Sequence, residues 1–182
     1  MFRLVLASFL FVNVAAAGIQ INVDGQHTQG VIEIELFEDV APAHSRRIKT
    51  LASQGFYDNV FFHRVIDGFM VQTGDGQFGK ASDNNLDKAG TGGSELSNLK
   101  AEFSNIPFDR GVVGMARSQS PDSANSQFFI MFKANYHLNG DYTVIGRVVS
   151  GLDVLDDIKR GDLSTFNITG LPDVMTSVTV ID

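Results

Sequence analysis

Hydrophobic and polar residues alternate with a period of two along much of the chain. The clearest run is VIEIEL at residues 31–36, in which apolar residues alternate with glutamates. This pattern is typical of a β-strand with one face buried and one face in solvent. Alternation, or a short apolar run bounded by turn residues, predicts eight strands in total, at residues 19–23, 30–37, 60–66, 70–73, 112–115, 127–132, 143–149 and 175–181.

Two segments instead repeat their apolar residues with the period of a helix. Residues 43–54 follow Pro42 and stop at Gly55, and residues 151–160 stop at Gly161. Proline at the first helical position and glycine just past the end are common helix boundaries. Eight strands and two helices predict a mainly β protein, a barrel or a sandwich whose openings the helices cover. Two helices are too few to connect a parallel sheet.

The first seventeen residues differ from the rest of the chain. Arg3 precedes an apolar run that reaches Val12, and the segment ends in three alanines at residues 15–17. A basic start, a short apolar stretch and small residues at the end are typical of a secretory signal peptide. We therefore predict a signal at residues 1–17 and one domain at residues 18–182, since no linker or repeat divides the remainder. The alternative for the apolar run is a buried first strand or helix.

Composition excludes several classes of protein. The chain has 182 residues, a net charge of −7 and no cysteine, so disulfides, thiolate metal sites and cysteine nucleophiles are ruled out. The acidic balance argues against nucleic acid or an anionic membrane as the main partner. The aromatic residues are skewed, with 15 phenylalanines and no tryptophan. Where those rings lie is therefore a useful question for the structure.

Several short motifs imitate known sites without the surroundings that the chemistry needs. Residues 74–79 spell G-x-G-x-x-G but lead into a polar segment with no helical period, which predicts a surface loop. Residues 83–94 lack the glycine and glutamate of a calcium loop, and S-x-x-K at 97–100 lacks its companion motifs. Residues 167–169 form a glycosylation sequon. The chain has four histidines, His27, His44, His63 and His137. No two of them have the spacing of metal ligands, so we propose no metal.

One strand carries an arginine among apolar residues. The segment VFFHRVIDGFMVQTGD, residues 60–75, places Arg64 beside phenylalanines and valine. Strict alternation would put Phe62, Arg64 and Ile66 on one face. Two interpretations stay open: a structural arginine that lies over apolar surface or in an ion pair, and an arginine that points into a cleft. A second Phe-rich strand at residues 126–132 reads as core for its Phe128 and Ile130.

Two longer stretches resemble a known family. FHRVIDGFMVQTGD at residues 62–75 and GVVGMARSQSPDSANSQFFI at residues 111–130 resemble the signature blocks of cyclophilin-type peptidyl-prolyl cis-trans isomerases. GTGGS at 90–94 and EFS at 102–104 lie between these blocks, and VVSGLDVLDDI at 148–158 follows them, in the order of the family. The resemblance is greatest to periplasmic cyclophilins of Gram-negative bacteria, which implies a periplasmic protein. It also implies an eight-stranded antiparallel β-barrel closed by two α-helices, with a substrate groove on the outer face.

The resemblance assigns roles residue by residue. Arg64 is the implied catalytic residue, and no cofactor or metal is implied. The implied substrate-binding residues are His63, Phe69, Met70, Gln72, Ala116, Arg117, Ser118, Gln127, Phe129, His137, Leu138 and Tyr142. His137 stands where the best-known eukaryotic members carry tryptophan, and Tyr142 where they carry histidine. Because that tryptophan donates to cyclosporin, we expect weak binding of the drug.

The implied activity is rotation about X–Pro peptide bonds during the folding of secreted proteins. The expected partners are unfolded or flexible polypeptides that contain proline, with no nucleic acid and, after signal cleavage, no membrane. We expect a monomer. The alternative is a binding module or chaperone that keeps the groove without turnover. Arg64 discriminates between these two: its presence with Phe69, Gln72 and Phe129 favours catalysis, whereas replacement of several of them would favour binding only.

Overall fold

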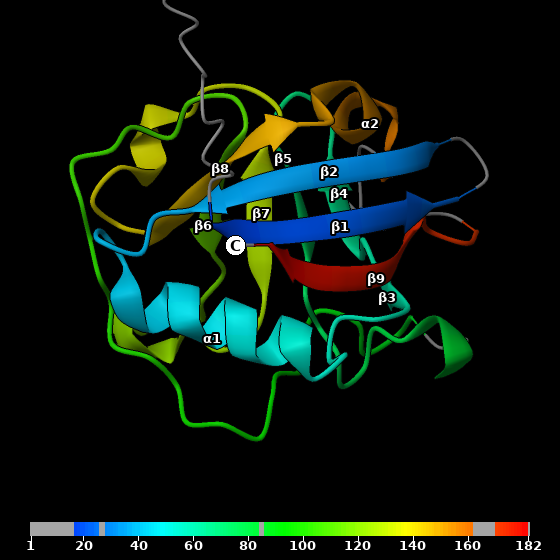
Figure 1. Ribbon diagram of the computed structural model, residues 1–182, viewed down its shortest axis with the longest axis horizontal. Helices are drawn as coiled ribbons and strands as arrows, with labels where there is room; N and C mark the ends of the chain where they lie inside the picture. Colours follow the sequence, from blue (N-terminus) through cyan, green and yellow to red (C-terminus); the bar gives the residue numbers. More distant parts are fainter. Residues whose placement is uncertain (1–16, 26–27, 84–85, 162–169, 182) are drawn as a thin grey trace, which may run out of the picture.

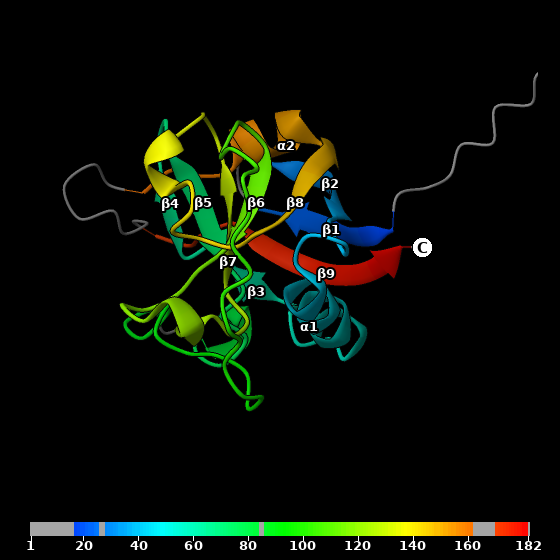
Figure 2. The same ribbon diagram turned by 90° about the vertical axis from the view of Figure 1, so that its left-hand side faces the viewer.

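The computed structural model describes residues 17–25, 28–83, 86–161 and 170–181. Its strands form one antiparallel sheet of nine strands in the order β3-β9-β1-β2-β8-β6-β7-β5-β4. The sheet curls around a common interior (Figures 1 and 2). The strands are β1 (Gly18–Asp24), β2 (Gln29–Leu36), β3 (Val60–Phe61), β4 (Arg64–Ile66), β5 (Met70–Thr73), β6 (Val112–Met115), β7 (Phe128–Met131), β8 (Val144–Ser150) and β9 (Val174–Ile181). The predicted sequon and nearly all of the predicted signal lie outside the described residues.

The mainly β fold class is confirmed, and seven of the eight predicted strands match single strands to within one or two residues. The exception is the predicted strand at residues 60–66, which is two strands, β3 and β4. β3 pairs with β9, whereas β4 pairs with β5. The chain changes partner at Phe62 and His63, and these two residues join the two ends of the sheet order. The apolar pattern of residues 60–66 is continuous across this point, because the choice of partner strand depends on residues far away in the sequence.

The exchange also corrects the predicted faces of this segment. Phe62 is fully buried in the main core, whereas Arg64 is exposed, so these two residues do not share a face. Within β4 the alternation holds, since Val65 is buried between exposed Arg64 and partly buried Ile66. Arg64 therefore lies on the outer surface of the curled sheet.

Two α-helices cover the sheet, α1 (Pro42–Ser53) and α2 (Leu152–Asp157), and they lie on opposite sides of the β1–β2 pair in Figure 1. α1 packs against β9 and β1, and α2 packs against β2. α2 is shorter than the predicted helix at 151–160. Its end is explained by tertiary hydrogen bonds: the Lys159 N–H donates to Asp173 and the Gly161 N–H donates to the carbonyl of Val65. Three short 3₁₀ turns complete the fold: η1 (Ala81–Asp83), η2 (Pro121–Ser123) and η3 (Tyr136–Leu138).

A glutamate from a distant loop caps the start of α1. Ala41 occupies the cap position and has no side-chain oxygen to offer. The Glu102 carboxylate accepts hydrogen bonds from the backbone N–H groups of Ala43 and His44, and from the buried His44 ring at 2.6 Å. Burial alone would raise the pKa of Glu102, but these hydrogen bonds lower it on balance. The EFS segment thereby holds the helix to the loop that precedes β6.

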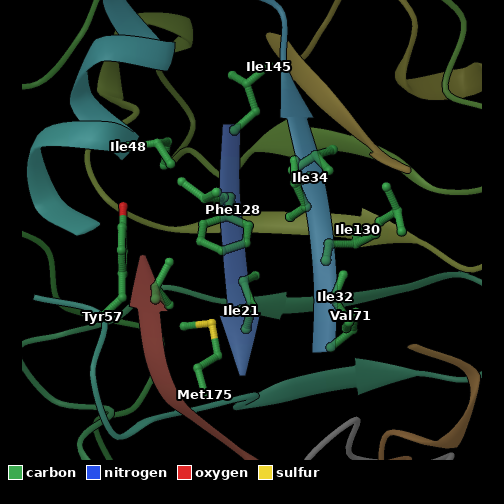
Figure 3. Packing of buried hydrophobic residues seen from close by; sticks show 14 of the residues in the cluster. Ile21, Ile32, Ile34, Ile48, Tyr57, Val71, Phe128, Ile130, Ile145 and Met175 are labelled. Atoms are coloured by element: carbon green, nitrogen blue, oxygen red, sulfur yellow. The ribbon is translucent and has the colours of Figure 1, made fainter. Parts of the chain in front are cut away.

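The two faces of the sheet carry separate apolar clusters. Phe128 and Ile130 of β7 point into the main core, which Figure 3 shows around the Phe128 ring. Phe129 and Met131 of the same strand belong to a second cluster on the outer face. The period of two in β7 thus divides its phenylalanines between the interior and the outer surface, and the predicted core roles of Phe128 and Ile130 are confirmed.

Candidate active site

One row of residues crosses the outer face of the sheet through β4, β5, β7 and β6. The register pairs Arg64 with Gln72, Gln72 with Phe129, and Phe129 with Gly114. Directly paired residues on neighbouring strands point to the same face, so an arginine, an amide and an aromatic ring stand side by side. The antiparallel register therefore builds the centre of the candidate site, and Figure 2 shows these four strands beside one another.

Apolar side chains surround a small hollow next to this row. The hollow has a volume of about 180 Å³ and opens to solvent. Its walls combine apolar and aromatic side chains with two arginines and one amide: Arg64, Phe69, Met70, Gln72, Ala116, Arg117, Phe129, Leu138 and Tyr142. All nine are among the site residues that the resemblance implies. Phe129 is only 5% exposed, since it stacks on Phe108 and forms a T-shaped pair with Tyr142, with ring centroids 5.6 Å apart in both pairs.

A chain of hydrogen bonds sets the position of the Arg64 guanidinium. Arg64 Nη1 donates to Gln72 Oε1 at 3.2 Å, and Gln72 Nε2 donates to Gln127 Oε1 at 2.9 Å. Gln127 Nε2 in turn donates to the carbonyls of Gly90 and Gly92, at 3.0 and 2.8 Å. Although Arg64 is exposed to solvent, the neighbouring side chains desolvate its guanidinium in part and lower its pKa, and the group stays charged at neutral pH. The amides orient this charge without neutralising it.

A buried carboxylate fixes the far end of this chain. Asp75 is fully buried, and its two oxygens accept four backbone N–H groups, from Gln77, Phe78, Gly90 and Gly92, at 2.8 to 3.1 Å. A carboxylate with four such donors is well satisfied without a counter-ion. The G-x-G-x-x-G segment is a loop, as predicted, and its aspartate anchors the loop at residues 90–92.

A second hollow, of about 510 Å³, adjoins the first and shares Gln72, Ala116 and Arg117 with it. Its lining is mainly backbone and small polar side chains, and it includes the implied site residues Ser118 and Gln127. The other residues of this lining were not predicted from the sequence; they are Gly90, Thr91, Gly92, Gly93, Ser94, Asn98, Ser123, Asn125 and Ser126. The GTGGS element was the available signal, but glycines and serines are too common to indicate a site without their fold.

Two implied site residues line neither hollow. The His63 ring nitrogens are buried, and the ring lies against Gly90 behind the second hollow. Burial lowers the pKa of His63 to about 4, although the charge of Asp75 opposes the shift, so the ring is neutral at pH 7. His137 is exposed on η3, next to Leu138 of the hollow wall.

The residues that the structure describes contain neither a cluster of metal ligands nor a membrane-spanning helix. In the described part of the chain, no group of three or more histidine, aspartate or glutamate side chains is placed to hold a metal ion. Within the same residues, no helix has the length and apolar character that crossing a bilayer requires.

Comparison with known proteins shows the family of this chain. Residues 19–180 match the family described as "Cyclophilin type peptidyl-prolyl cis-trans isomerase/CLD". A "Probable peptidyl-prolyl cis-trans isomerase" of Brucella suis is 47% identical, with 97% of this chain and 94% of the relative covered. A peptidyl-prolyl cis-trans isomerase of Acinetobacter baylyi is 37% identical, with 75% of this chain and 71% of the relative covered. The chain belongs to the cyclophilin-type peptidyl-prolyl cis-trans isomerase family.

A solved structure supports the fold. The cyclophilin-type isomerase of Cryptosporidium parvum, crystallised in the presence of the dipeptide Ala-Pro, superposes with a TM-score of 0.75 at 24% identity. The match covers 91% of this chain and 99% of the relative. The curled antiparallel sheet with two helices is therefore the cyclophilin-like fold, with nine strands here against the eight that were predicted.

Proposed function

We propose that this protein catalyses rotation about X–Pro peptide bonds, with Arg64 as the catalytic residue and the 180 Å³ hollow as the proline site. The observation that carries the proposal is the position of the Arg64 guanidinium, at the rim of an apolar hollow and hydrogen-bonded to Gln72. The substrates are flexible or unfolded segments that contain proline. The Cryptosporidium protein was crystallised in the presence of Ala-Pro, a dipeptide that contains proline.

The reaction needs no nucleophile, because no covalent bond is broken. The barrier to rotation, ~18–20 kcal/mol, comes from the amide resonance that is lost halfway. The twisted prolyl nitrogen regains a localised lone pair and can accept a hydrogen bond that the planar amide accepts poorly. A guanidinium held in place therefore stabilises the transition state more than the ground state. Gln72 supplies the orientation, since it accepts from Arg64 Nη1.

The apolar walls have a separate task. Phe69, Met70, Phe129 and Leu138 offer a surface for a proline ring and no competing hydrogen bonds. With the ring held, the remainder of the peptide turns about the X–Pro bond. Exclusion of water by these side chains also favours the less polar twisted amide over the planar one.

Replacement of the guanidinium tests the proposal. We expect Arg64→Ala to lower kcat/KM for a proline peptide by roughly two to three decades, which corresponds to about 3 to 4 kcal/mol of transition-state stabilisation. Exchange spectroscopy by NMR on a capped proline peptide measures the rate. The fold is expected to persist, because the Arg64 side chain is exposed and belongs to neither apolar cluster.

The matched control is Arg46→Ala, which removes an exposed arginine from α1. Its kcat/KM is expected to equal that of the wild-type protein. Wild-type protein that binds the peptide but shows no rate above the uncatalysed one would contradict the proposal and favour a module that only binds. Cyclosporin in the same assay is expected to inhibit weakly, since the chain contains no tryptophan.

We further propose that the protein acts in the periplasm, as a monomer, on secreted proteins that fold there. The signal-like segment at residues 1–17 supports this location. The position of β1 is compatible with cleavage after residue 17, because its pairing with β2 begins at Gly18. The lack of cysteine suits an oxidising compartment, where an unpaired thiol could form wrong disulfides.

A further inference from the structure

The two hollows of the groove carry positive charge only. Arg64 and Arg117 are the only charged side chains that line them, and neither hollow has an aspartate or glutamate among its described lining residues. The protein as a whole has a net charge of −7. The groove therefore differs in sign from the molecule that surrounds it, and Arg117 belongs to both hollows.

The Arg117 guanidinium is held in a fixed position. Its Nε donates to the carbonyl of Asp141 at 2.9 Å, and its Nη1 donates to the carbonyls of Ser118 and Gln119 at 2.9 and 3.3 Å. Its Cζ lies 4.5 Å from the centre of the Tyr142 ring. A guanidinium that is already oriented loses little freedom when a ligand binds.

One side of this guanidinium stays available. Arg117 Nη2 makes no hydrogen bond with any residue that the structure describes. A nitrogen with two N–H donors at a groove wall suits a carboxylate, because charge-assisted hydrogen bonds are stronger than neutral ones.

The nearby acidic residues do not occupy this position. Asp75 is buried and accepts four backbone N–H groups. Asp122 accepts from the backbone N–H of Ala101, and Asp141 meets Arg117 through its main-chain carbonyl. None of the three is among the residues that line the hollows. The positive charge of Arg117 is thus left for a substrate.

We infer that Arg117 selects substrates with an aspartate or glutamate close to the proline. The inference rests on the proposed function, since it places the proline in the smaller hollow. A peptide bound there runs past Arg117 into the larger hollow, whose remaining lining is uncharged. A carboxylate side chain on this part of the peptide meets Arg117 Nη2, whereas a lysine side chain meets a like charge.

Capped peptides with a single proline test the inference. Glu, Gln or Lys is placed in turn at each position from three residues before to three residues after the proline, with acetylated and amidated ends. At the best position we expect wild-type kcat/KM to be roughly five- to tenfold higher for Glu than for Gln, and lower for Lys than for Gln. In Arg117→Gln the Glu to Gln ratio is expected to fall to about one.

Controls separate selection from structure. Arg46→Gln removes a positive charge from α1 and is expected to keep the wild-type Glu to Gln ratio. If Arg117 serves only to hold the loop at residues 117–119, Arg117→Gln lowers the rates of all peptides and leaves their ratio unchanged, which overturns the inference. An uncapped Gln peptide adds a main-chain carboxylate; a gain there without a gain for Glu also overturns it.

Failure of the proposed function has a different signature. Wild-type protein that accelerates none of the peptides overturns the isomerase activity and the inference with it. Wild-type protein that accelerates Glu and Gln peptides equally at every position keeps the activity and overturns the selection by Arg117.

Discussion

His63 places an imidazole inside the protein, directly behind the groove. Both ring nitrogens are buried, close to the Gln127 side chain and to the backbone of Phe61. The ring fits closely, since a Cβ added at Gly90 would lie 3.0 Å from His63 Cδ2. Burial lowers the pKa of His63 to about 4, so a proton binds the unfolded chain more readily than the folded one. His63 thus supports the loop of the second hollow in its neutral form only.

The pH dependence of folding follows from this shift. The stability that neutral His63 contributes is complete above its unfolded pKa of ~6.5 and is lost as the pH falls toward about 4. Between pH 7 and pH 4.5 we expect the free energy of unfolding to fall by about 2 to 3 kcal/mol through this residue. Urea unfolding at the two pH values measures it, and His63→Gln should show a smaller fall.

The matched control is His137→Gln, which alters an exposed histidine and should keep the wild-type fall. Acid titration of carboxylates such as Glu102, whose pKa is lowered, contributes to all three proteins alike. If the free energy of unfolding falls equally in the wild type and in His63→Gln, the folded protein protonates His63 as readily as the unfolded chain does, and the prediction is wrong.

Single residues also show what sequence reasoning can reach. Arg64 stood out in an apolar strand, but pattern alone left its role open between structure and chemistry. The residues that the resemblance places beside it, Phe69, Gln72 and Phe129, line the smaller hollow together with Arg64. The role of Asp75 was not predictable, because its four donors come from two loops that only the fold brings together.

At the scale of elements, β6 shapes the smaller hollow by having no side chain at one position. Gly114 pairs with Phe129 on β7. A Cβ at Gly114 would lie 2.6 Å from Phe129 Cζ and 2.7 Å from Phe108 Cε1. Both rings are buried, so neither can move without disturbing the wall of the hollow. The bare backbone of β6 is what lets the two rings stack.

We expect Gly114→Ala to displace the Phe129 ring. Overpacking of this kind costs about 1 to 3 kcal/mol of folding stability. Because Phe129 is a wall of the hollow, kcat/KM should also fall severalfold, as measured by NMR exchange on a proline peptide.

Met175→Ala is the matched control, since Met175 is fully buried in the main core on β9. It should cost about 2 to 5 kcal/mol of stability and leave kcat/KM near the wild-type value while the protein is folded. A Gly114→Ala protein with full activity would show that the reaction tolerates a shift of this ring.

Elements also mark the limit of local patterns. Alternation or a short apolar run predicts β1, β2, β5 and β6, and these strands keep the same neighbours along their paired lengths. The segment at residues 60–66 has an equally apolar pattern, yet it passes from β9 to β5 as its partner. The pairing of β3 with β9 joins residues more than a hundred positions apart, so the sequence of residues 60–66 alone cannot predict it.

At the scale of the whole molecule, the location of the protein is the open prediction. Expressed with its own first seventeen residues in a Gram-negative host, the protein should be recovered from the periplasm with Gly18 at its N-terminus. Cell fractionation and intact-mass measurement test this. Cleavage removes Ala17, whose carbonyl accepts the Leu36 N–H, and leaves the ladder from Gly18 onward intact.

A charged substitution in the apolar run, Leu6→Arg, is the control, because it should keep the full-length protein in the cytoplasm. A wild-type protein that stays in the cytoplasm with Met1 to Ala17 attached would contradict the predicted signal, and the proposed periplasmic role would fail while the isomerase activity stood.

The pairing of β1 with β9 has a consequence in time. β1 lies inside the sheet between β2, which follows it directly, and β9, which ends the described chain. During synthesis β1 therefore cannot pair with β9 until β9 has left the ribosome. Closing a loop between two strands so far apart in sequence is also slow. We expect the nascent chain to stay incompletely folded throughout its synthesis. A chain of this topology can cross a membrane through a translocation channel while it is still unfolded, and form its sheet after export.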